Sequence, residues 1–404
     1  MPADPTAVNV ASTRRRIVVL GSTGSIGLNC LDVVAHLKDR LQIVGLSAHS
    51  NWEMLFDQAN RWKPRWITLT NPDVPFPRKN GKTGACCEVL YDEEGIATMV
   101  SDPEVDVVVI AIVGAAGLKG TWAALEAGKT VAVANKETLV MAGPLVMDLA
   151  HKRRARVIPV DSEHSAIFQA LQNGRAHEVE RVVLTASGGP FRGRTREQLS
   201  EVTVEDALRH PTWRMGPKIT VDSATLMNKA LEVIEARWLF GLDPDRIEVI
   251  IHPESIIHSF VEFIDGSVLA QLSPPDMRLP IQYALTWPDR VAGPARKLNW
   301  KELQAWHFEQ PDRDTFPALQ LGYEVARRGG TCGAILNAAN EAAVSRFLAG
   351  DLAFLDIARA CRDVLAHHHY STRPNLAELQ AADRWARQEV ARWKTRTELT
   401  APVT

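Results

Sequence analysis

The chain is poor in cysteine and has no long apolar run. Its 404 residues include five cysteines, an odd number, and none of them stands in a C-x-x-C spacing. This usage fits a reducing compartment and gives no zinc-site pattern, so we expect a cytoplasmic protein. No apolar run reaches the ~18 residues of a membrane span, so no membrane partner is expected.

The chain also lacks a charge excess and a secretory leader. Its formal net charge is −2 and its pI about 6.6, which is not the basic footprint of a nucleic-acid-binding protein. We therefore expect no nucleic-acid partner, and any anionic ligand must be held by local donors. The first residues are rich in Ala, Pro and Thr and contain no apolar signal segment, so residues 1–15 are expected to form a disordered tail.

Between residues 16 and 160, short apolar runs alternate with stretches of helical spacing. Val105–Val113 is apolar on both faces, as a strand must be in a parallel sheet that helices cover on both sides. We predict strands at Ile17–Leu20, Leu41–Ser47, Val105–Val113, Thr130–Ala134 and Arg156–Val160, and helices at Ser25–Leu37, Trp52–Trp62 and Thr121–Ala127. The alternation indicates a doubly wound, Rossmann-like α/β domain.

Residues 161–300 have a different pattern, typical of an α+β domain. We predict helices at Ala166–Gln172 and Leu226–Phe240, and strands at Arg181–Thr185, Ile247–Ile251, Ser255–Ile264 and Ser267–Leu272. Asp265-Gly266 between the last two strands predicts a hairpin with a type I′ turn. The polar stretch 192–216 has few apolar anchors, which is typical of a disordered segment or a functional lid.

Residues 301–404 are expected to form a linker and a third, all-helical domain. Helical periodicity begins after Phe316 and predicts helices at Ala318–Arg327, Gly333–Ala349, Phe354–His367 and Leu376–Trp393. A chain of this length exceeds what one hydrophobic core usually supports, so three domains are reasonable.

The stretch "GSTGSIG" follows the first predicted strand and opens the first predicted helix. Its glycines, Gly21, Gly24 and Gly27, have the spacing G-x-x-G-x-x-G rather than the common G-x-G-x-x-G. Glycine permits a tight turn and close backbone approach, and the free N–H groups of a helix N-terminus attract an anion. Ser22, Thr23 and Ser25 would add hydroxyl donors. We expect a nucleotide phosphate here; the alternative is a glycine-rich turn without a ligand.

The end of the second predicted strand favours NADP over NAD. An NAD site usually carries an acid there to hold the ribose 2′-hydroxyl, whereas this chain reads "GLSAHSN" without one. The absent carboxylate removes repulsion against a 2′-phosphate, and His49, Ser50 and Asn51 can donate to it.

Polar residues follow three predicted strands at the edge where α/β proteins bind ligands. The three ends are "GAAG" after Val105–Val113, Asn135-Lys136-Glu137 after Thr130–Ala134, and Asp161-Ser162-Glu163 after Arg156–Val160. On extended backbone, Asp161 and Glu163 would point the same way and repel unless a cation or proton lies between them, which suits Mg²⁺ or Mn²⁺. The alternatives are a surface ion pair at Lys136–Glu137 and a helix N-terminal acid pair at Asp161 and Glu163.

A second cluster lies in "VDSATLMNKALEVIEARW". Asn228 and Glu232 are spaced i, i+4 and Lys229 and Glu232 i, i+3, so on a helix they share a face. The alternatives are a surface salt bridge for Lys229–Glu232 and a capping role for Asp222.

Long stretches of the chain closely resemble the 1-deoxy-D-xylulose 5-phosphate reductoisomerase family. They are "GSTGSIG", "NKETLV", "PVDSEHSAIFQAL", "SGGPF", "HPTWRMG", "KITVDSATLMNKALEVIEARWLF", "IIHPESIIHS" and "DGSVLAQL". The resemblance runs from about Arg16 to beyond Phe354, and the "VDSEH" and "MNKALEVIEARWLF" motifs are specific to this family.

The resemblance implies an activity in non-mevalonate isoprenoid biosynthesis. Members convert 1-deoxy-D-xylulose 5-phosphate to 2-C-methyl-D-erythritol 4-phosphate by a retro-aldol/aldol rearrangement followed by hydride reduction. They use NADPH and a divalent metal, Mg²⁺, Mn²⁺ or Co²⁺, and form homodimers. The implied fold is an NADP-binding domain, a catalytic and dimerisation domain with a lid at 192–216, and a helical C-terminal domain.

The resemblance also implies roles for individual residues. The metal ligands match Asp161, Glu163 and Glu232. Substrate-contacting positions match Lys136, Ser162, Glu163, Ser187, His210, Trp213, Met215, Ser223, Asn228, Lys229 and Glu232, with Ser187, Ser223, Asn228 and Lys229 holding the phosphate. Cofactor positions match Gly21, Thr23, Gly24, Ser25, Ile26, Asn51, Asn135, Glu137 and Gly216. Lys136, Glu163 and His210 are the candidates for catalysis.

At one point the chain departs from the family pattern. Some relatives have Gly and a basic residue where this chain has His49-Ser50. Ser50 would then contact the 2′-phosphate in place of a basic side chain.

Two rival functions are a plain NADP-dependent dehydrogenase, which needs no metal, and a nucleotide-binding sensor, which has no use for the carboxylates.

Overall fold

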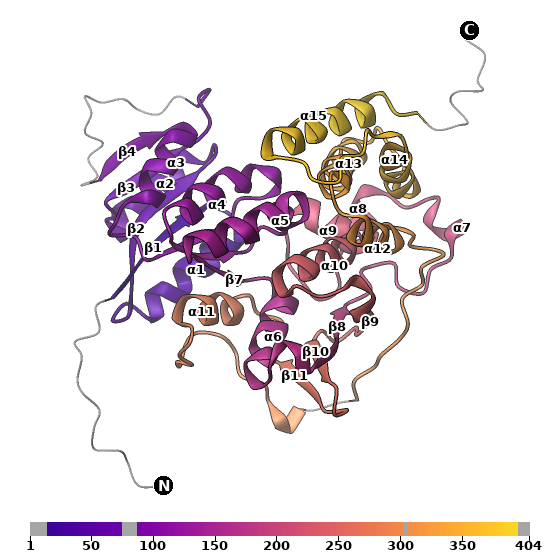
Figure 1. Cartoon of the computed structure of the whole chain (residues 1–404), viewed down its shortest axis with the longest axis horizontal. Coiled ribbons are helices and arrows are strands. Elements are labelled where there is room, and N and C mark those ends of the chain that lie inside the picture. Colours follow the sequence, from indigo (N-terminus) through magenta and orange to yellow (C-terminus); the bar gives the residue numbers. More distant parts are fainter. Residues whose placement is uncertain (1–13, 75–86, 303–304, 395–404) are drawn as a thin grey trace.

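The computed structural model describes residues 14–74, 87–302 and 305–394 of the chain. Residues 1–13 of the expected tail lie outside the described residues. Arg15, by contrast, already belongs to strand β1, so the predicted tail extended slightly too far. Figure 1 shows two sheets and a group of C-terminal helices: the larger sheet with α1–α5, the smaller sheet at the bottom, and α12–α15 at the upper right.

A seven-stranded parallel sheet forms the N-terminal part of the molecule. Its strand order is β4-β3-β2-β1-β5-β6-β7, so the direction of winding reverses between β1 and β5. The strands are β1 Arg15–Leu20, β2 Leu41–Ala48, β3 Trp66–Leu69, β4 Glu88–Tyr91, β5 Val107–Ile110, β6 Thr130–Val133 and β7 Arg156–Pro159. This confirms the Rossmann-like fold, and the reversal predicts that a ligand binds at the carboxyl ends of β1 and β5. The sequence reading missed β3 and β4, which have four residues each.

Helices α1–α5 cover this sheet. They are α1 Ser25–His36, α2 Trp52–Trp62, α3 Asp92–Ser101, α4 Gly117–Glu126 and α5 Lys136–Arg153. The sequence reading did not predict α3 or α5. Helix α5 gives no amphipathic signal because its first eight residues are all buried, and it contains Gly143 and Pro144. Gly143 is required there, because a Cβ would lie 2.3 Å from Cδ1 of Trp238.

The smaller sheet has four strands in the order β11-β10-β8-β9. They are β8 Val179–Ala186, β9 Ile247–Ile251, β10 Ile257–Phe263 and β11 Val268–Leu272; α6 Ser162–Ala170 packs on β10 and β11. The predicted β10–β11 hairpin is confirmed, but its turn type is wrong. A type I′ turn needs positive φ at both central residues, and of Asp265 and Gly266 only Gly266 has one, at 83°.

The C-terminal helices share one hydrophobic core with the smaller sheet. They are α12 Ala318–Arg328, α13 Cys332–Leu348, α14 Phe354–His367 and α15 Leu376–Arg392. Helix α12 packs on α10 Met227–Phe240, and α14 and α15 pack on α13. The core is continuous from Val182 of β8 through Leu231 of α10 to Ile357 of α14. It therefore crosses the domain boundary that the sequence predicts at residue 300.

Helix α11 Arg278–Thr286 is a further element that the sequence reading missed. It falls within the predicted α+β domain, yet Ile281, Ala284 and Leu285 are buried in the core of the larger sheet. The chain thus returns from the second domain to cover the first.

Residues 192–216 contain two short helices, α7 Arg196–Leu199 and α8 Val204–Ala207. Each is capped by a threonine, and Leu199 and Ala207 anchor the stretch in the core. Helix α9 Pro217–Ala224 follows directly. In the part of the chain that the structure describes, no helix combines the length and apolar character that crossing a bilayer requires.

Candidate active site

The glycine turn after β1 uses its three glycines differently. At Gly21, φ is 82° and a Cβ would lie 2.7 Å from the carbonyl oxygen of Ala111; at Gly27 it would lie 2.4 Å from the Gly21 oxygen. These two glycines allow the turn to pack against the end of β5 and under α1. Gly24 is the exposed N-cap residue of α1, and as a glycine it has no side chain that could cap the helix. The first N–H groups of α1 are therefore available to an anion.

The hydroxyl groups of this turn differ in how far they are buried. Ser22 is fully buried and donates to Gln58 Oε1 at 2.6 Å, so it is not the phosphate donor that the sequence reading proposed. Ser25 is exposed at the start of α1, while Thr23 and Ile26 are half-buried. Ser25 and Thr23 are the hydroxyl-bearing residues that face the helix N-terminus.

The end of β2 carries three exposed polar residues. His49 Nδ1 lies 3.1 Å from Thr70 Oγ1, and Ser50 Oγ accepts from Asn71 Nδ2 at 3.1 Å. Asn51 caps α2 by accepting from the backbone N–H of Met54. The segment after β2 therefore presents polar side chains, and no carboxylate within "SAHSN", beside the glycine turn.

Asn135 and Glu137 begin α5 at the same carboxyl edge of the sheet, and both side chains are buried. The Asn135 amide donates to the carbonyls of Ile112 and Gly114, and its oxygen caps Thr138. The Glu137 carboxylate accepts from Lys218 Nζ at 2.8 Å. The alternative of a Lys136–Glu137 surface pair is wrong, since each of the two pairs elsewhere in the interior.

Three carboxylates converge at the carboxyl ends of β7 and on α10. Oxygens of Asp161, Glu163 and Glu232 all lie within 4.8 Å of one another. The premise of extended backbone was wrong: Asp161 is the N-cap of α6 and Glu163 lies in its first turn. The helix start still brings the two together, and Glu232, fully buried on α10, completes the group. The acids thus cap a helix and also form an all-oxygen donor set that fits a hard divalent cation.

Two buried lysines lie among these carboxylates. Lys136 Nζ is 2.9 Å from Asp161 Oδ2 and 3.1 Å from Glu232 Oε1, and it donates to Asn228 Oδ1 at 2.7 Å. Lys229 Nζ is 2.9 Å from Glu163 Oε1 and also contacts Glu232. The Lys229–Glu232 pair is therefore not a surface salt bridge. Two ammonium groups facing three carboxylates leave a negative site in the interior.

The pKa values follow from burial and these contacts. Burial, followed by the charge of Glu232, raises the pKa of Glu163 to about 7. For Asp161 burial acts in the same direction, but Lys136 and its other cationic neighbours outweigh it and the pKa is lowered. The pKa of Lys136 is raised well above its usual range, because Asp161 and Glu232 overcome the opposing effect of burial.

Behind the carboxylates lies a buried pair that the sequence reading missed. His164 Nδ1 is 3.2 Å from Glu235 Oε2 and 3.7 Å from Asp161 Oδ1, and Nε2 is 3.1 Å from the carbonyl oxygen of Glu232. Burial raises the pKa of Glu235 to about 7. His164 thereby joins α6 to α10 beneath the acidic group. Its position next to Glu163 in the sequence was the available signal.

His210 joins two serines into a candidate anion subsite. Its Nε2 lies 3.0 Å from Ser187 Oγ and 3.1 Å from Ser223 Oγ, although the three come from different segments. Its Nδ1 accepts the backbone N–H groups of Thr212 and Trp213. Those two bonds place the hydrogen on Nε2, and burial lowers the pKa, so the imidazole is neutral and presents a donor.

The remaining predicted residues surround this subsite. Trp213 is half-buried with its ring centroid 6.3 Å from that of His258, and Met215 is half-buried two residues later. Gly216 is the exposed N-cap of α9. Ser162 Oγ donates to Glu163, and Asn228 Nδ2 donates to Glu232 Oε1 at 2.6 Å.

Asp222 is not a cap. It is fully buried within α9, where its two oxygens accept from Asn340 of α13 and pair with Lys218, each at 2.8 Å. Lys218, Asp222 and Asn340 are site-forming residues that the sequence reading did not select. The i, i+4 spacing of Lys218 and Asp222 was visible in the sequence, but their burial was not.

Comparison with known proteins places this geometry in a family. Three family models match the chain: 1-deoxy-D-xylulose 5-phosphate reductoisomerase at residues 17–143, its C-terminal domain at 157–240, and the DXP reductoisomerase C-terminal domain at 272–389. A 1-deoxy-D-xylulose 5-phosphate reductoisomerase from Pelotomaculum thermopropionicum is 52% identical over 374 residues, which cover 92% of this chain and 97% of that protein. The one from Heliobacterium modesticaldum is 51% identical, with 93% and 96% covered.

Solved structures of reductoisomerases also match the chain. The reductoisomerase from Zymomonas mobilis in complex with NADPH is 42% identical, with a TM-score of 0.88 over 94% of this chain and 99% of that one. A DOX-P reductoisomerase in complex with NADPH, fosmidomycin and magnesium is 38% identical, also with a TM-score of 0.88, over 94% of this chain and 98% of that one. The chain therefore belongs to the 1-deoxy-D-xylulose 5-phosphate reductoisomerase family.

Proposed function

We propose that the chain is an NADPH- and divalent-metal-dependent oxidoreductase that converts 1-deoxy-D-xylulose 5-phosphate to 2-C-methyl-D-erythritol 4-phosphate. The observation that carries this proposal is the convergence of Asp161, Glu163 and Glu232 beside a separate anion subsite. A plain dehydrogenase has no need of a buried three-carboxylate group, and a nucleotide sensor has no need of either feature.

The three carboxylates fit a divalent ion. Asp161, Glu163 and Glu232 would hold Mg²⁺ or Mn²⁺, with Co²⁺ as a further candidate, because their oxygens already converge within 4.8 Å. A metal bound there would polarise the substrate ketone for rearrangement. The chain's part is to keep the acids ionised and oriented, with Lys136 and Lys229 balancing two of the three charges.

The phosphate of the substrate belongs at the subsite of Ser187, His210 and Ser223. Neutral His210 donates from Nε2, the serines donate from their hydroxyls, and Asn228 and Lys229 extend the set from α10. Holding the phosphate away from the reacting carbons orients the substrate and uses remote binding energy in the reaction. Trp213 and Met215, in the segment 192–216, form the proposed lid that excludes water.

The cofactor belongs along the carboxyl edge of the larger sheet. The pyrophosphate of NADPH would take the N–H groups at Gly24, Ser25 and Ile26 with the Thr23 hydroxyl, and the 2′-phosphate would meet Ser50 and Asn51. NADPH supplies the hydride for the reduction. Asn135 and Glu137 are both hydrogen-bonded within the chain, so they act on the cofactor through the shape of its site. At Gly216 no atom lies within 4 Å of an added Cβ, which leaves space for the cofactor.

Proton transfer falls to groups at the carboxylate cluster. Lys136 is the candidate donor, since its ammonium lies 2.9 Å from Asp161 Oδ2 and 3.1 Å from Glu232 Oε1, within the carboxylate cluster. Glu163 is the candidate base, with Ser162 donating to its carboxylate.

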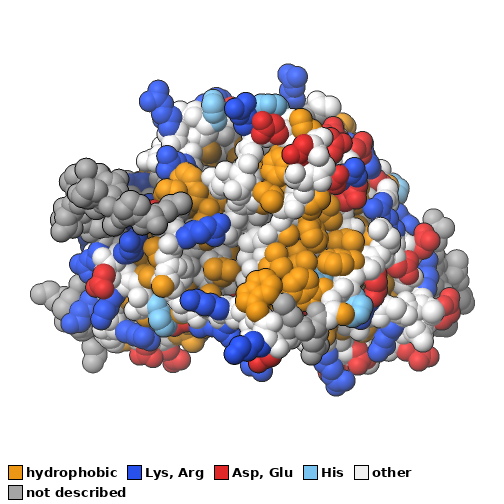
Figure 2. Space-filling model, turned by 90° about the horizontal axis from the view of Figure 1, so that it is seen from below, with side chains coloured by type: hydrophobic (Ala, Val, Ile, Leu, Met, Phe, Trp, Pro, Cys, Tyr) orange, Lys and Arg blue, Asp and Glu red, His pale blue; other side chains and the backbone are white. Residues whose placement is uncertain are grey.

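A second copy of the chain is the proposed partner. Strand β11 is the edge of the smaller sheet, and its first three residues are exposed. Figure 2 shows hydrophobic side chains gathered on the face that carries this sheet. The exposed apolar residues of this region are Ile264, Val268, Leu269, Trp300 and Phe308. An unpaired apolar edge is typical of a surface that homodimerisation covers.

We also propose a cytoplasmic location, in keeping with the free cysteines.

The decisive assay follows NADPH oxidation with 1-deoxy-D-xylulose 5-phosphate, with and without Mg²⁺. We expect turnover that requires both the substrate and the metal, stops with excess EDTA, resumes with added Mg²⁺, and is slower with NADH. Turnover that persists unchanged in EDTA would instead identify a metal-independent dehydrogenase. Product analysis for the branched tetrol phosphate separates rearrangement from simple reduction.

A further inference from the structure

A cavity of about 320 Å³ lies between α7, α12 and α14, outside the site described above. Its apolar walls include Phe316, Leu321, Phe354 and Ala358. Its charged lining consists of four arginines, Arg196, Arg313, Arg359 and Arg362, and two acids, Asp314 and Glu324. Four positive and two negative side chains leave an excess of two positive charges, in a chain whose net charge is −2.

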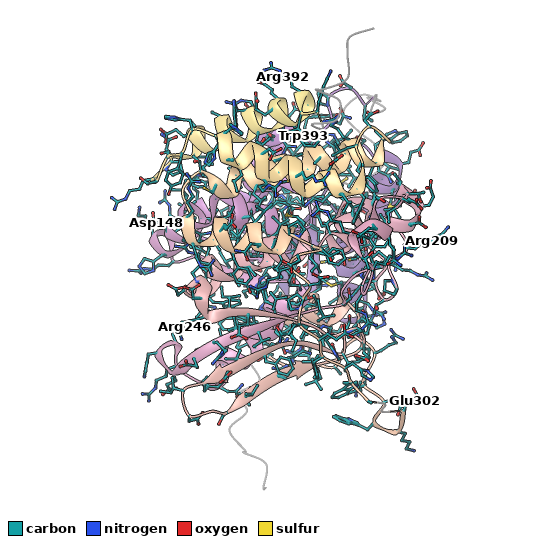
Figure 3. The ribbon with its side chains drawn as sticks, turned by 90° about the vertical axis from the view of Figure 1, so that its right-hand side faces the viewer. Asp148, Arg209, Arg246, Glu302, Arg392 and Trp393 are labelled. Carbon is teal, nitrogen blue, oxygen red and sulfur yellow. The ribbon has the colours of Figure 1, made fainter. Side chains whose placement is uncertain are left out.

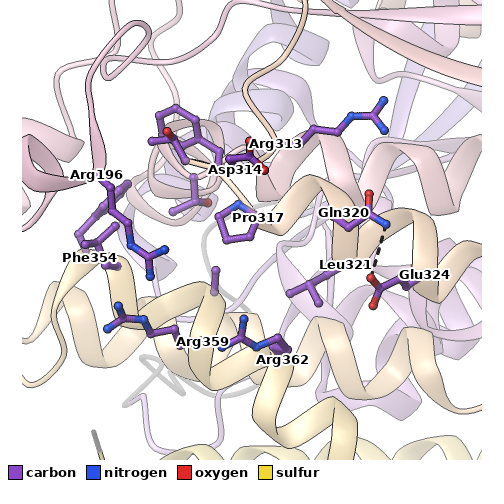
Figure 4. Close-up of a pocket in the computed structure, with 15 residues that line it drawn as sticks. Arg196, Arg313, Asp314, Pro317, Gln320, Leu321, Glu324, Phe354, Arg359 and Arg362 are labelled. Atoms are coloured by element: carbon purple, nitrogen blue, oxygen red, sulfur yellow. Dashed lines mark hydrogen bonds between the residues drawn. The ribbon is translucent and has the colours of Figure 1, made fainter. Parts of the chain in front are cut away.

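The arginines of this cavity are only partly neutralised by the chain. Arg359 pairs with Asp356 at 2.8 Å, whereas the ion pair of Arg362 with Asp363 is as long as 3.9 Å. Across residues 14–74, 87–302 and 305–394, no carboxylate pairs with Arg196. Figure 4 shows the guanidinium groups of Arg196, Arg359 and Arg362 directed toward the same end of the cavity, away from Glu324.

This convergence comes from two separate elements. Arg359 and Arg362 are spaced i, i+3 on α14 and so share a face, while Arg196 approaches from the first position of α7. Like charges brought together beside apolar walls repel one another, and a bound anion removes that repulsion. Guanidinium groups bind phosphate oxygens through paired N–H donors, which makes arginine the usual residue for this task.

We propose that the cavity binds a small anion bearing one or two phosphate groups, held between Arg196 of α7 and Arg359 and Arg362 of α14. The volume is at the lower end of the range for small-molecule pockets, which favours a compact anion over an acidic peptide. The proposal is independent of the proposed function, because Arg359 and Arg362 lie on α14, outside the catalytic and cofactor set, and Arg196, although it lies in the segment 192–216, is not among the residues that the proposed function uses.

Calorimetric titration of the full chain with inorganic pyrophosphate tests the proposal. The titration is run without metal, both alone and with saturating 1-deoxy-D-xylulose 5-phosphate, so that the substrate phosphate subsite is occupied in one arm. The variants are Arg196→Gln and Arg362→Gln. The matched control is Arg392→Gln on α15, which also removes one positive charge; Arg392 is 76% exposed and projects outward (Figure 3).

We expect pyrophosphate binding that persists in saturating substrate, weakens about tenfold in Arg196→Gln and in Arg362→Gln, and is unchanged in Arg392→Gln. Three results would overturn the proposal. They are the absence of measurable binding with substrate present, an equal effect of all three substitutions, and tighter binding of tetraglutamate than of pyrophosphate. The thermal melting temperature of each variant, at the wild-type value, checks that the fold is intact.

Discussion

The ammonium group of Lys218 lies 2.8 Å from a carboxylate oxygen of Glu137 and 2.8 Å from one of Asp222. Glu137 stands at the start of α5, next to Lys136, and Asp222 stands in α9, next to Ser223. Lys218 therefore connects the start of α5, beside the proposed cofactor site, to α9, which carries one serine of the proposed phosphate subsite. Burial acts to raise the pKa of Glu137, but Lys218 outweighs it and the pKa is lowered.

Replacing Lys218 with Met is expected to destabilise the chain strongly, because two buried carboxylates lose their counter-charge. Breaking a buried pair from one side costs roughly 3–5 kcal/mol. Lys218→Met combined with Glu137→Gln should cost less than the sum of the two single changes, which a double-mutant cycle of thermal unfolding measures. The matched control is Lys152→Met, since Lys152 and Asp148 form an exposed pair of the same two charges. Additive single effects would show that Lys218 does not couple the two elements.

Glu232→Gln is expected to lower metal-dependent turnover at least ~100-fold, because it removes a charged metal ligand while keeping the shape of the side chain. NADPH binding, followed by the change in its fluorescence, should be retained because Glu232 lies on α10, away from the glycine turn. Near-wild-type turnover in this variant would exclude Glu232 as a ligand. Loss of NADPH binding would point to a general structural defect instead.

Glu163 gives a pH dependence of stability for the metal-free protein. Its folded-state pKa of about 7 exceeds the ordinary value of 4.5, so the folded state binds its proton more tightly than the unfolded state. This contribution is fully present below pH ~4.5 and is lost as the pH rises through about 7. Glu163→Gln should therefore melt at a higher temperature than wild type at pH 8, with the difference shrinking toward pH 5. Thermal melts in EDTA across this range measure it, and a difference that is the same at both pH values would contradict it.

His210→Ala should raise KM for the phosphorylated substrate about tenfold, while leaving KM for NADPH unchanged. The substitution removes the Nε2 donor shared by Ser187 and Ser223 and frees the backbone N–H groups of Thr212 and Trp213. Steady-state kinetics with each substrate varied in turn checks this. His210→Gln, which keeps a side-chain N–H donor, is expected to recover part of the loss; equal loss in both variants would assign His210 a purely structural role.

The sequence predicts the strand ends well, for a physical reason. Runs such as Val107–Ile110 are apolar on both faces and can only be central strands, and the carboxyl ends of parallel strands meet at one edge. Strand β7, at the border of the sheet next to β6, runs parallel to these strands, so the positions of Asp161 and Glu163 directly after it suffice to place both acids at the same carboxyl edge. Their helical backbone could not be predicted, because "DSEH" after a strand is compatible with either extended or helical geometry.

The site residues and helices that the sequence does not predict depend on contacts between distant segments. Lys218 and Glu137 are 81 residues apart, and no periodicity in either segment indicates that they meet. Helix α5 lacks an amphipathic pattern because its first eight residues are all buried, so periodicity cannot detect it. Helix α11 lies, in the sequence, within the predicted α+β domain. Its apolar face nevertheless packs into the core of the larger sheet, and the local sequence does not indicate this.

We expect Ser50 to influence how strongly the chain prefers NADPH, since the resemblance implies that it stands where some family members have a basic residue. Ser50→Asp places a carboxylate at the end of β2, where it should repel a 2′-phosphate and accept from a 2′-hydroxyl, raising KM for NADPH about tenfold and lowering KM for NADH. Ser50→Arg should have the opposite effect on NADPH, through a charge-assisted contact. Both are measured as kcat/KM for each cofactor at saturating substrate and metal. Asp73→Ser, a charge change at an exposed residue after β3, serves as the control. If neither Ser50 variant shifts the ratio of kcat/KM for NADPH to that for NADH, Ser50 does not hold the 2′-phosphate. Asn51 or the backbone of the turn would then be the candidate donor.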